Sequence, residues 1–83
     1  MNKQRLYEEL KNNPKNIRFK RLCKIAEAFG FTLRKGKGSH FIFTRPDVSE
    51  LLNFQNIKGK AKPYQVKQLI KIIEKYGLSE EDE

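Results

Sequence analysis

The sequence has few of the residues that support metal, disulfide or cofactor chemistry. Its 83 residues include one cysteine, one histidine and no tryptophan. A single cysteine excludes an internal disulfide, and one cysteine with one histidine is too few for a structural zinc site. The chain also has no glycine-rich turn between a strand and a helix, which excludes the dinucleotide-binding folds. We therefore expect neither a metal nor a cofactor.

Long apolar runs are absent as well. No segment approaches the roughly 18 consecutive apolar residues of a spanning helix, and no apolar leader follows Met1. We expect a soluble, cytoplasmic chain with no membrane partner. At 9.8 kDa and 37% hydrophobic residues, with six phenylalanines and three tyrosines, the chain is long enough for one small core and no second domain.

Acidic residues are scarce, and they are unevenly placed. The chain has 10 Asp and Glu against 18 Lys and Arg, a net charge of +8. Four of the acids are the last four residues, so residues 1–78 hold every cation and only the other six acids. A basic body of this size attracts polyanions, above all nucleic acid. The acidic end at residues 79–83 is expected to be a solvated tail, or else a screen over the basic face.

Apolar spacing and turn residues predict a mixed order of elements. Helices are expected over residues 3–12, 18–29 and 63–76, and strands over residues 31–34, 39–44 and 51–55. Lys35–Gly38 is the expected turn of the first hairpin. This order predicts an α+β fold in which helices pack on one face of a three-stranded antiparallel sheet. Residues 1–15 are predicted to add an N-terminal helix and turn, residues 16–78 to form the domain, and residues 79–83 to form the acidic tail.

Alternation along the second strand separates two sets of side chains. His40, Ile42 and Thr44 share one face, and Phe41 and Phe43 share the other. The two phenylalanines are the better candidates for the core, which places His40 on the open face. The alternative is that both rings form a platform on which nucleic acid bases stack.

His40 is the one side chain in the sequence that exchanges a proton near neutral pH. It follows a glycine-rich tip and stands close to Arg34, Lys35 and Lys37. RNA carries its own nucleophile, the 2′-hydroxyl, so a base together with cations that neutralise the phosphate is enough to cleave a strand without metal. Ser39, a lysine or water is a candidate for the second group. The alternative is a surface histidine with no role.

A second basic cluster precedes the last predicted helix. Lys58, Lys60 and Lys62 alternate just before Pro63, which is expected at the first helical position. The free N–H groups and positive dipole end of a helix N-terminus, together with three lysines, predict a phosphate clamp. The alternative is a solvated loop.

The segment Gly36–His40, followed by Phe41, Ile42 and Phe43, resembles the Gly-Ser-His strand of HicA toxins. These are small mRNA interferases of prokaryotic toxin–antitoxin pairs. Residues 19–34 resemble the helix and strand that precede this motif in the family, and residues 60–69 resemble the start of its last helix. The resemblance covers roughly residues 16–78, and residues 1–15 lie outside the family pattern.

The resemblance implies a fold like that of the double-stranded-RNA-binding domain. It also implies a toxin that cleaves mRNA as an endoribonuclease with His40 as catalytic residue, and a HicB-like antitoxin as protein partner. From their types and positions, the residues expected to bind RNA are Arg34, Lys35, Lys37, Ser39, Lys58, Lys60 and Lys62. The alternative function is a non-catalytic RNA-binding module of the same fold.

Overall fold

The helices and strands follow one another in the order that the sequence predicts. The computed structural model describes residues 2–81. The elements in this range are α1 (Lys3–Asn12), α2 (Phe19–Ala28), β1 (Thr32–Lys37), β2 (His40–Arg45), β3 (Val48–Gln55), α3 (Pro63–Tyr76) and the short 3-10 helix η1 (Leu78–Glu80). None of the described helices has both the length and the apolar character needed to cross a membrane.

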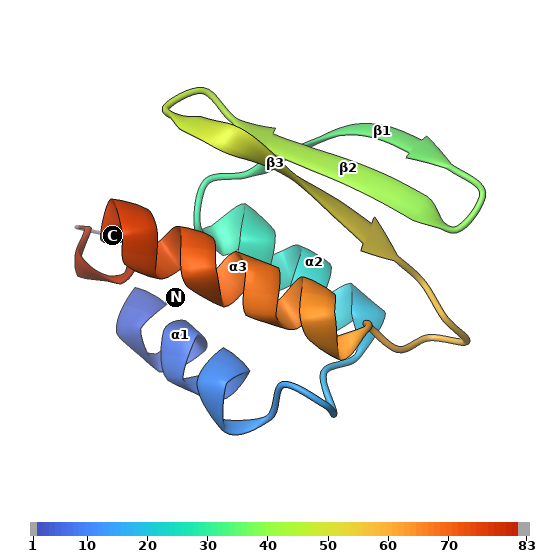
Figure 1. The fold of residues 1–83 in the computed structure, drawn as a ribbon, viewed down its shortest axis with the longest axis horizontal. Coiled ribbons are helices and arrows are strands. Elements are labelled where there is room, and N and C mark those ends of the chain that lie inside the picture. The colour runs from blue at the N-terminus through green and yellow to red at the C-terminus, as the bar shows by residue number, and fades with distance from the viewer. Residues whose placement is uncertain (1, 82–83) are drawn as a thin grey trace.

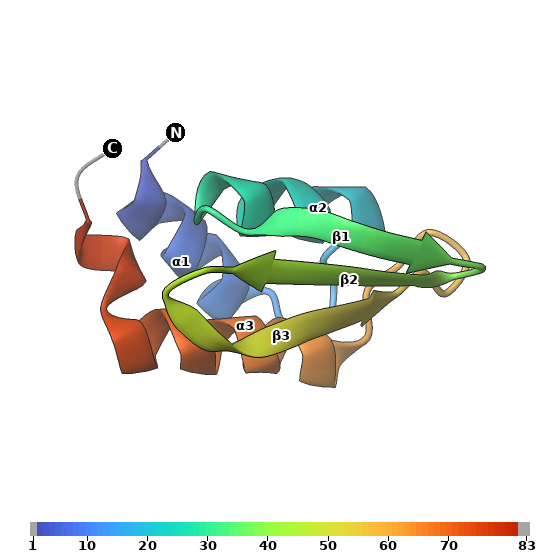
Figure 2. The same ribbon diagram turned by 90° about the horizontal axis from the view of Figure 1, so that it is seen from above.

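The three strands form one antiparallel sheet in the order β1-β2-β3. Helices α2 and α3 lie side by side against one face of this sheet, and the opposite face is open (Figures 1 and 2). Helix α1 lies on the side of α2 and α3 that is away from the sheet (Figure 1). The predicted α+β fold, with helices on one face of a three-stranded sheet, is confirmed.

The two hairpins differ in detail from the prediction. Lys35–Gly38 is not the first turn, because β1 continues to Lys37 and the turn is Gly38–Ser39. Gly38 has a φ of +60° and Ser39 has no positive φ, which is the pattern of a type II′ turn. Strand β3 begins at Val48 and not at residue 51, because the second turn needs only Pro46 and Asp47.

Gly36 lies within β1, directly opposite Phe41 of β2. A Cβ atom on Gly36 would lie 3.1 Å from Cδ2 of the Phe41 ring. Glycine at this position therefore leaves room for Phe41, whose ring packs against Phe19 of α2 at 5.0 Å between centroids. The contribution of Gly36 is this space, and not the turn conformation that the sequence suggested.

The core lies between the sheet and the helices. Phe43 is 2% exposed, and its ring packs against that of Phe54 at 5.5 Å between centroids. Phe41 is half-buried against the same cluster. The prediction that Phe41 and Phe43 face the core is confirmed, and the stacking platform is wrong for both rings.

Helix α1 contributes to the same core. Leu6 and Leu10 are buried in it, and the Tyr7 hydroxyl donates a hydrogen bond to the Glu74 carboxylate of α3. Arg21 of α2 donates two hydrogen bonds of 2.8 Å to the two carboxylate oxygens of Glu9. The additional helix is therefore a structural part of the domain.

The end of the chain is held by Arg45. Its guanidinium donates to Glu81 at 2.7 Å, to Asp47 at 2.7 Å and to the Phe29 carbonyl oxygen at 2.8 Å. Glu81 also pairs with Lys3 at 3.5 Å, and Leu78 is buried. Within the expected tail, Glu81 is therefore attached to the domain while Glu80 is exposed, and residues 82–83 lie outside the described residues.

Leu10→Ala tests the structural role of α1. Leu10 is 0% exposed, so its truncation removes apolar contacts and leaves a cavity, which costs about 2–5 kcal/mol of unfolding free energy. Leu51→Ala is the matched control, because Leu51 is 50% exposed and its loss is expected to cost about 0.5 kcal/mol or less. Urea denaturation followed by circular dichroism measures both. Equal stability of the two variants would contradict a core role for α1.

Candidate functional site

The pleat of β2 places His40 on the open face of the sheet. Phe41 and Phe43 point toward the helices, so the residues between and beside them point away. His40 is exposed, at the first position of β2. Its direct neighbours across the ladder are Lys37 of β1 and Gln55 of β3.

Asn53 contacts the imidazole of His40. The Nδ1 atom of His40 lies 3.3 Å from Oδ1 of Asn53 on β3. An amide oxygen only accepts hydrogen bonds, so this contact favours the tautomer with the proton on Nδ1. That tautomer leaves the lone pair on Nε2, where it can accept a proton. Asn53 was not among the residues predicted from the sequence.

Two lysines of the first hairpin lie on the same face of the sheet as His40. Lys37 is directly opposite His40, and Lys35 is directly opposite Ile42, the next outward residue of β2. Both lysines are exposed. Ser39 lies in the turn beside His40, and its backbone carbonyl accepts a hydrogen bond of 2.8 Å from the Asn56 N–H. This bond ties the loop after β3 to the turn that carries the histidine.

The basic loop of residues 56–62 has a defined backbone. Ile57 and Lys60 exchange two backbone hydrogen bonds of 3.0 Å, and the Gly59 N–H donates to Asn56 Oδ1 at 2.7 Å. Lys58, with a φ of 52°, is held at the tip. Lys58 and Lys60 are exposed. The loop is therefore ordered and presents these two lysines to solvent.

The same loop is attached to the start of α2. The Phe19 N–H donates to the Gly59 carbonyl oxygen at 3.0 Å, and Arg18 pairs with Lys60 in an isolated antiparallel bridge. Arg18 and Lys20 are exposed at this point, and neither was predicted from the sequence. Lys62 precedes α3 and is half-buried, with its Nζ atom 5.7 Å from the centroid of the Tyr64 ring. The lysines of the predicted clamp thus lie at the N-terminal ends of both α2 and α3.

Charge is separated along the molecule. Residues 10–26, 28–46 and 51–73 contain no acid, and these stretches carry the Gly38–Ser39 turn, His40 and the basic loop. The turn and the loop lie at one end of the domain, and the β2–β3 turn and the end of α3 lie at the other (Figure 1). Within residues 2–81, none of Lys35, Lys37, Lys58, Lys60 and Lys62 forms an ion pair. Among the residues that the structure describes, the end that carries His40 is thus a cationic surface without acids.

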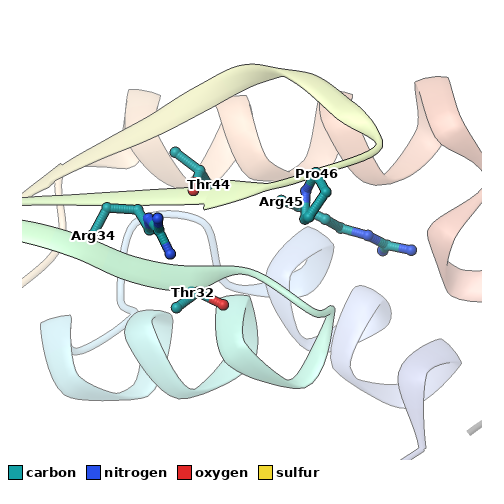
Figure 3. Close-up of a pocket in the computed structure, with 5 residues that line it drawn as sticks. All are labelled: Thr32, Arg34, Thr44, Arg45 and Pro46. Carbon is teal, nitrogen blue, oxygen red and sulfur yellow. The ribbon is translucent and has the colours of Figure 1, made fainter.

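Arg34 is separated from the other predicted site residues. It occupies a β-bulge between Leu33 and Lys35 and lines a pocket toward the far end of β1 and β2 (Figure 3). The remaining lining residues are Thr32, Thr44, Arg45 and Pro46. The structure therefore brings six of the seven predicted RNA-binding residues to one end with His40 and places Arg34 apart.

Cys23 and Glu50 also carry groups that can react, and the surroundings of each suppress its reactivity. Burial is the main cause that raises the pKa of the Cys23 thiol to about 11, so the thiol is protonated at neutral pH and is a poor nucleophile. Hydrogen bonds from Lys75 and then Tyr76 lower the pKa of Glu50 to about 2, so this carboxylate carries no proton to donate. Neither group faces His40 in the described structure, which leaves His40 as the candidate for proton transfer.

Comparison with known proteins places this site within a family. A family model described as "HicA toxin of bacterial toxin-antitoxin" matches residues 19–75. No curated protein and no solved structure matches the chain. The matched residues run from the first residue of α2 into the last turn of α3, and they include the whole sheet, His40 and the basic loop. The match covers more than half of the chain and confirms the resemblance noted in its motifs. The chain therefore belongs to the HicA toxin family of bacterial toxin–antitoxin systems.

Proposed function

We propose that this toxin is a metal-independent endoribonuclease that cleaves mRNA, with His40 as its catalytic residue. One observation carries the proposal. His40 faces solvent on the open side of the sheet, at the end of the molecule where the described residues include several unpaired lysines and no acid. Its contact with Asn53 leaves Nε2 as the nitrogen that accepts a proton.

The reaction follows from the chemistry of RNA. Nε2 of His40 takes the proton of a 2′-hydroxyl, and the resulting oxygen attacks the adjacent phosphorus. The bond from phosphorus to the 5′-oxygen of the next nucleotide breaks, and this oxygen takes up a proton from water or from Lys37. The products are a 2′,3′-cyclic phosphate and a free 5′-hydroxyl. Lysine charges near the reacting phosphate stabilise the extra negative charge of the transition state.

The cationic end supplies the binding energy for the strand. Lys35 and Lys37 flank His40 on the sheet, and Lys58 and Lys60 extend from the loop that is bonded to the same turn. Contacts of this kind hold the phosphate backbone and do not read sequence. The proposed substrate is therefore RNA that is held by its backbone over the His40 end of the sheet.

The family implies a second partner, an antitoxin protein. We propose that a HicB-like antitoxin covers His40 and the lysines around it. A partner that brings carboxylates would be complementary to this surface, because the described residues place no acid of the toxin there. Binding there would compete directly with RNA for the same cations.

A non-catalytic RNA-binding module is the second candidate. The observation that favours it is the position of Lys58, Lys60 and Lys62 at the N-terminal ends of α2 and α3, where backbone N–H groups and lysines together attract phosphate. Such a surface binds RNA whether or not His40 is present, so the loss of cleavage on removal of His40 distinguishes the two functions.

His40→Ala is expected to abolish cleavage and to leave the fold intact. His40 is exposed and its side chain is outside the core, so circular dichroism and RNA affinity should match those of the wild type. A general base contributes about 10²–10⁴-fold to rate, which is the expected loss. The assay uses purified protein, labelled RNA and EDTA, and the product ends are identified by mass spectrometry. Cleavage that persists in the variant would exclude His40 as the catalytic residue.

Asn53→Ala is expected to lower kcat by about tenfold with little change in KM, because Asn53 orients the imidazole and does not hold the substrate. Asn53→Asp should restore most of kcat, because a carboxylate also accepts the hydrogen bond from Nδ1. Single-turnover kinetics on one RNA oligonucleotide measure all three proteins. An equal loss in the Ala and Asp variants would show that the hydrogen bond has no part in positioning His40.

Lys58→Gln with Lys60→Gln is expected to weaken the salt dependence of RNA binding. Glutamine keeps an unbranched polar side chain, if a shorter one, and leaves the backbone strain at Lys58, whose φ is 52°, while it removes the charge. Loss of two phosphate contacts should reduce the slope of log K against log salt by about 1.4 for a single strand. The matched control is Lys24→Gln with Lys71→Gln, two exposed lysines on the helices. Equal changes in the two double variants would contradict a specific role for the loop.

A further inference from the structure

The pocket that Arg34 lines opens at the end of the β1–β2 hairpin that is away from the Gly38–Ser39 turn. It has a volume of about 300 Å³ and is lined by Thr32, Arg34, Thr44, Arg45 and Pro46. Thr32 and Thr44 are directly opposite each other in the ladder, on the face that also carries His40 and Ile42. In the view of Figure 3 the Arg34 guanidinium lies between these two threonines.

The two arginines of the pocket have different surroundings. The Arg45 guanidinium is fully engaged with Asp47, Glu81 and the Phe29 carbonyl oxygen. The Arg34 side chain forms no hydrogen bond or ion pair with any residue in the described part of the chain. Arg45 is therefore a structural residue, and the guanidinium of Arg34 is available to bind a ligand.

A β-bulge lies at Arg34. The register of β1 against β2 shifts between Leu33 and Lys35, so Arg34 is the additional residue without a partner in β2. Bulges of this kind occur often beside functional sites. Alternation from Leu33, which is opposite Phe43, places Arg34 toward the open face, and Lys35 is opposite the outward Ile42. The bulge therefore lets two consecutive cations, Arg34 and Lys35, share the open face.

The chemistry of the pocket fits a phosphate group. A guanidinium binds two phosphate oxygens at once, and the threonine hydroxyls on either side can donate further hydrogen bonds. The adjacent carboxylate, Asp47, is bonded by Arg45 at 2.7 Å and is thereby neutralised. A Pro46 ring at the rim offers apolar contact to a sugar or a base.

We propose that this Arg34 pocket is a subsite for a phosphate of the RNA strand, remote from the phosphate that is cleaved. The proposal rests on the proposed endoribonuclease function. Thr44 is four residues along β2 from His40, which is about 13 Å at the rise of a β-strand. A strand that crosses the open face from His40 therefore reaches Arg34 with a phosphate more than one position from the cleaved bond, and the subsite fixes its direction over the sheet.

The experiment compares a series of oligonucleotides that each carry one uncharged linkage at a different position. The oligonucleotide is 2′-deoxy except at one ribose, so a single bond can be cleaved, and one methylphosphonate replaces each phosphate in turn. For wild type, kcat/KM should fall about tenfold at one position more than one phosphate from the ribose, because a charge-assisted hydrogen bond is lost there. Arg34→Ala should show a similar fall on the unmodified substrate and no further fall at that position.

Lys71→Ala is the matched control, since Lys71 is an exposed cation on α3 outside this face, and it should keep the wild-type profile. The affinity of the same oligonucleotides for His40→Ala, measured by fluorescence anisotropy, gives a second readout that does not depend on turnover. A flat wild-type profile at the remote positions, or the same remote fall in Arg34→Ala, would overturn the subsite and leave the ribonuclease intact. Absence of cleavage of any RNA by wild type would overturn the proposed function and the subsite together.

Discussion

The pleat of β2 is the constraint on which the rest of the structure depends. Phe41 and Phe43 must face α2 and α3, because the small core contains few other large side chains that the sheet can supply. This requirement turns His40, Ile42 and Thr44 outward together. A shift of one residue in register would bury the imidazole and expose both rings, so the core and the site are specified by the same pairing. The open face is thus a consequence of how the closed face is packed.

Charge is arranged so that the acids stabilise the fold and the cations beside His40 stay free. The ion pairs of the described residues join α1 to α2 and α3, β3 to α3, and the end of the chain to Arg45. None of them reaches the Gly38–Ser39 turn or the basic loop. Lysines held close together repel one another, and a polyanion that binds there relieves this repulsion. The electrostatic repulsion within this surface of the free protein therefore favours the binding of a polyanion.

Local pattern was sufficient to predict the element order, the inward phenylalanines and the outward His40. It was not sufficient to predict the features that arise where the pattern of a strand is interrupted, such as a β-bulge or a register shift. The bulge at Arg34 changes the pairing of β1 with β2, and the register shift between Phe43 and Arg45 changes the pairing of β2 with β3. The second shift puts Gln55 directly opposite His40 and Asn53 opposite Ile42, and Asn53 contacts His40 from there. The backbone hydrogen bond from Phe19 to Gly59 joins segments that are 40 residues apart, and no motif in either segment predicts it. The role of α1 was also hidden, because its two buried leucines are typical of any short amphipathic helix.

Arg45 fixes the position of an acid near the end of the described chain. By holding Glu81 beside the β2–β3 turn, it keeps this carboxylate away from the end that carries His40. Glu81 therefore does not screen the lysines around the histidine, and among the described residues no other acid is placed to do so. Membership of the HicA family implies pairing with an antitoxin. A partner with acidic side chains would be complementary in charge to this end of the toxin.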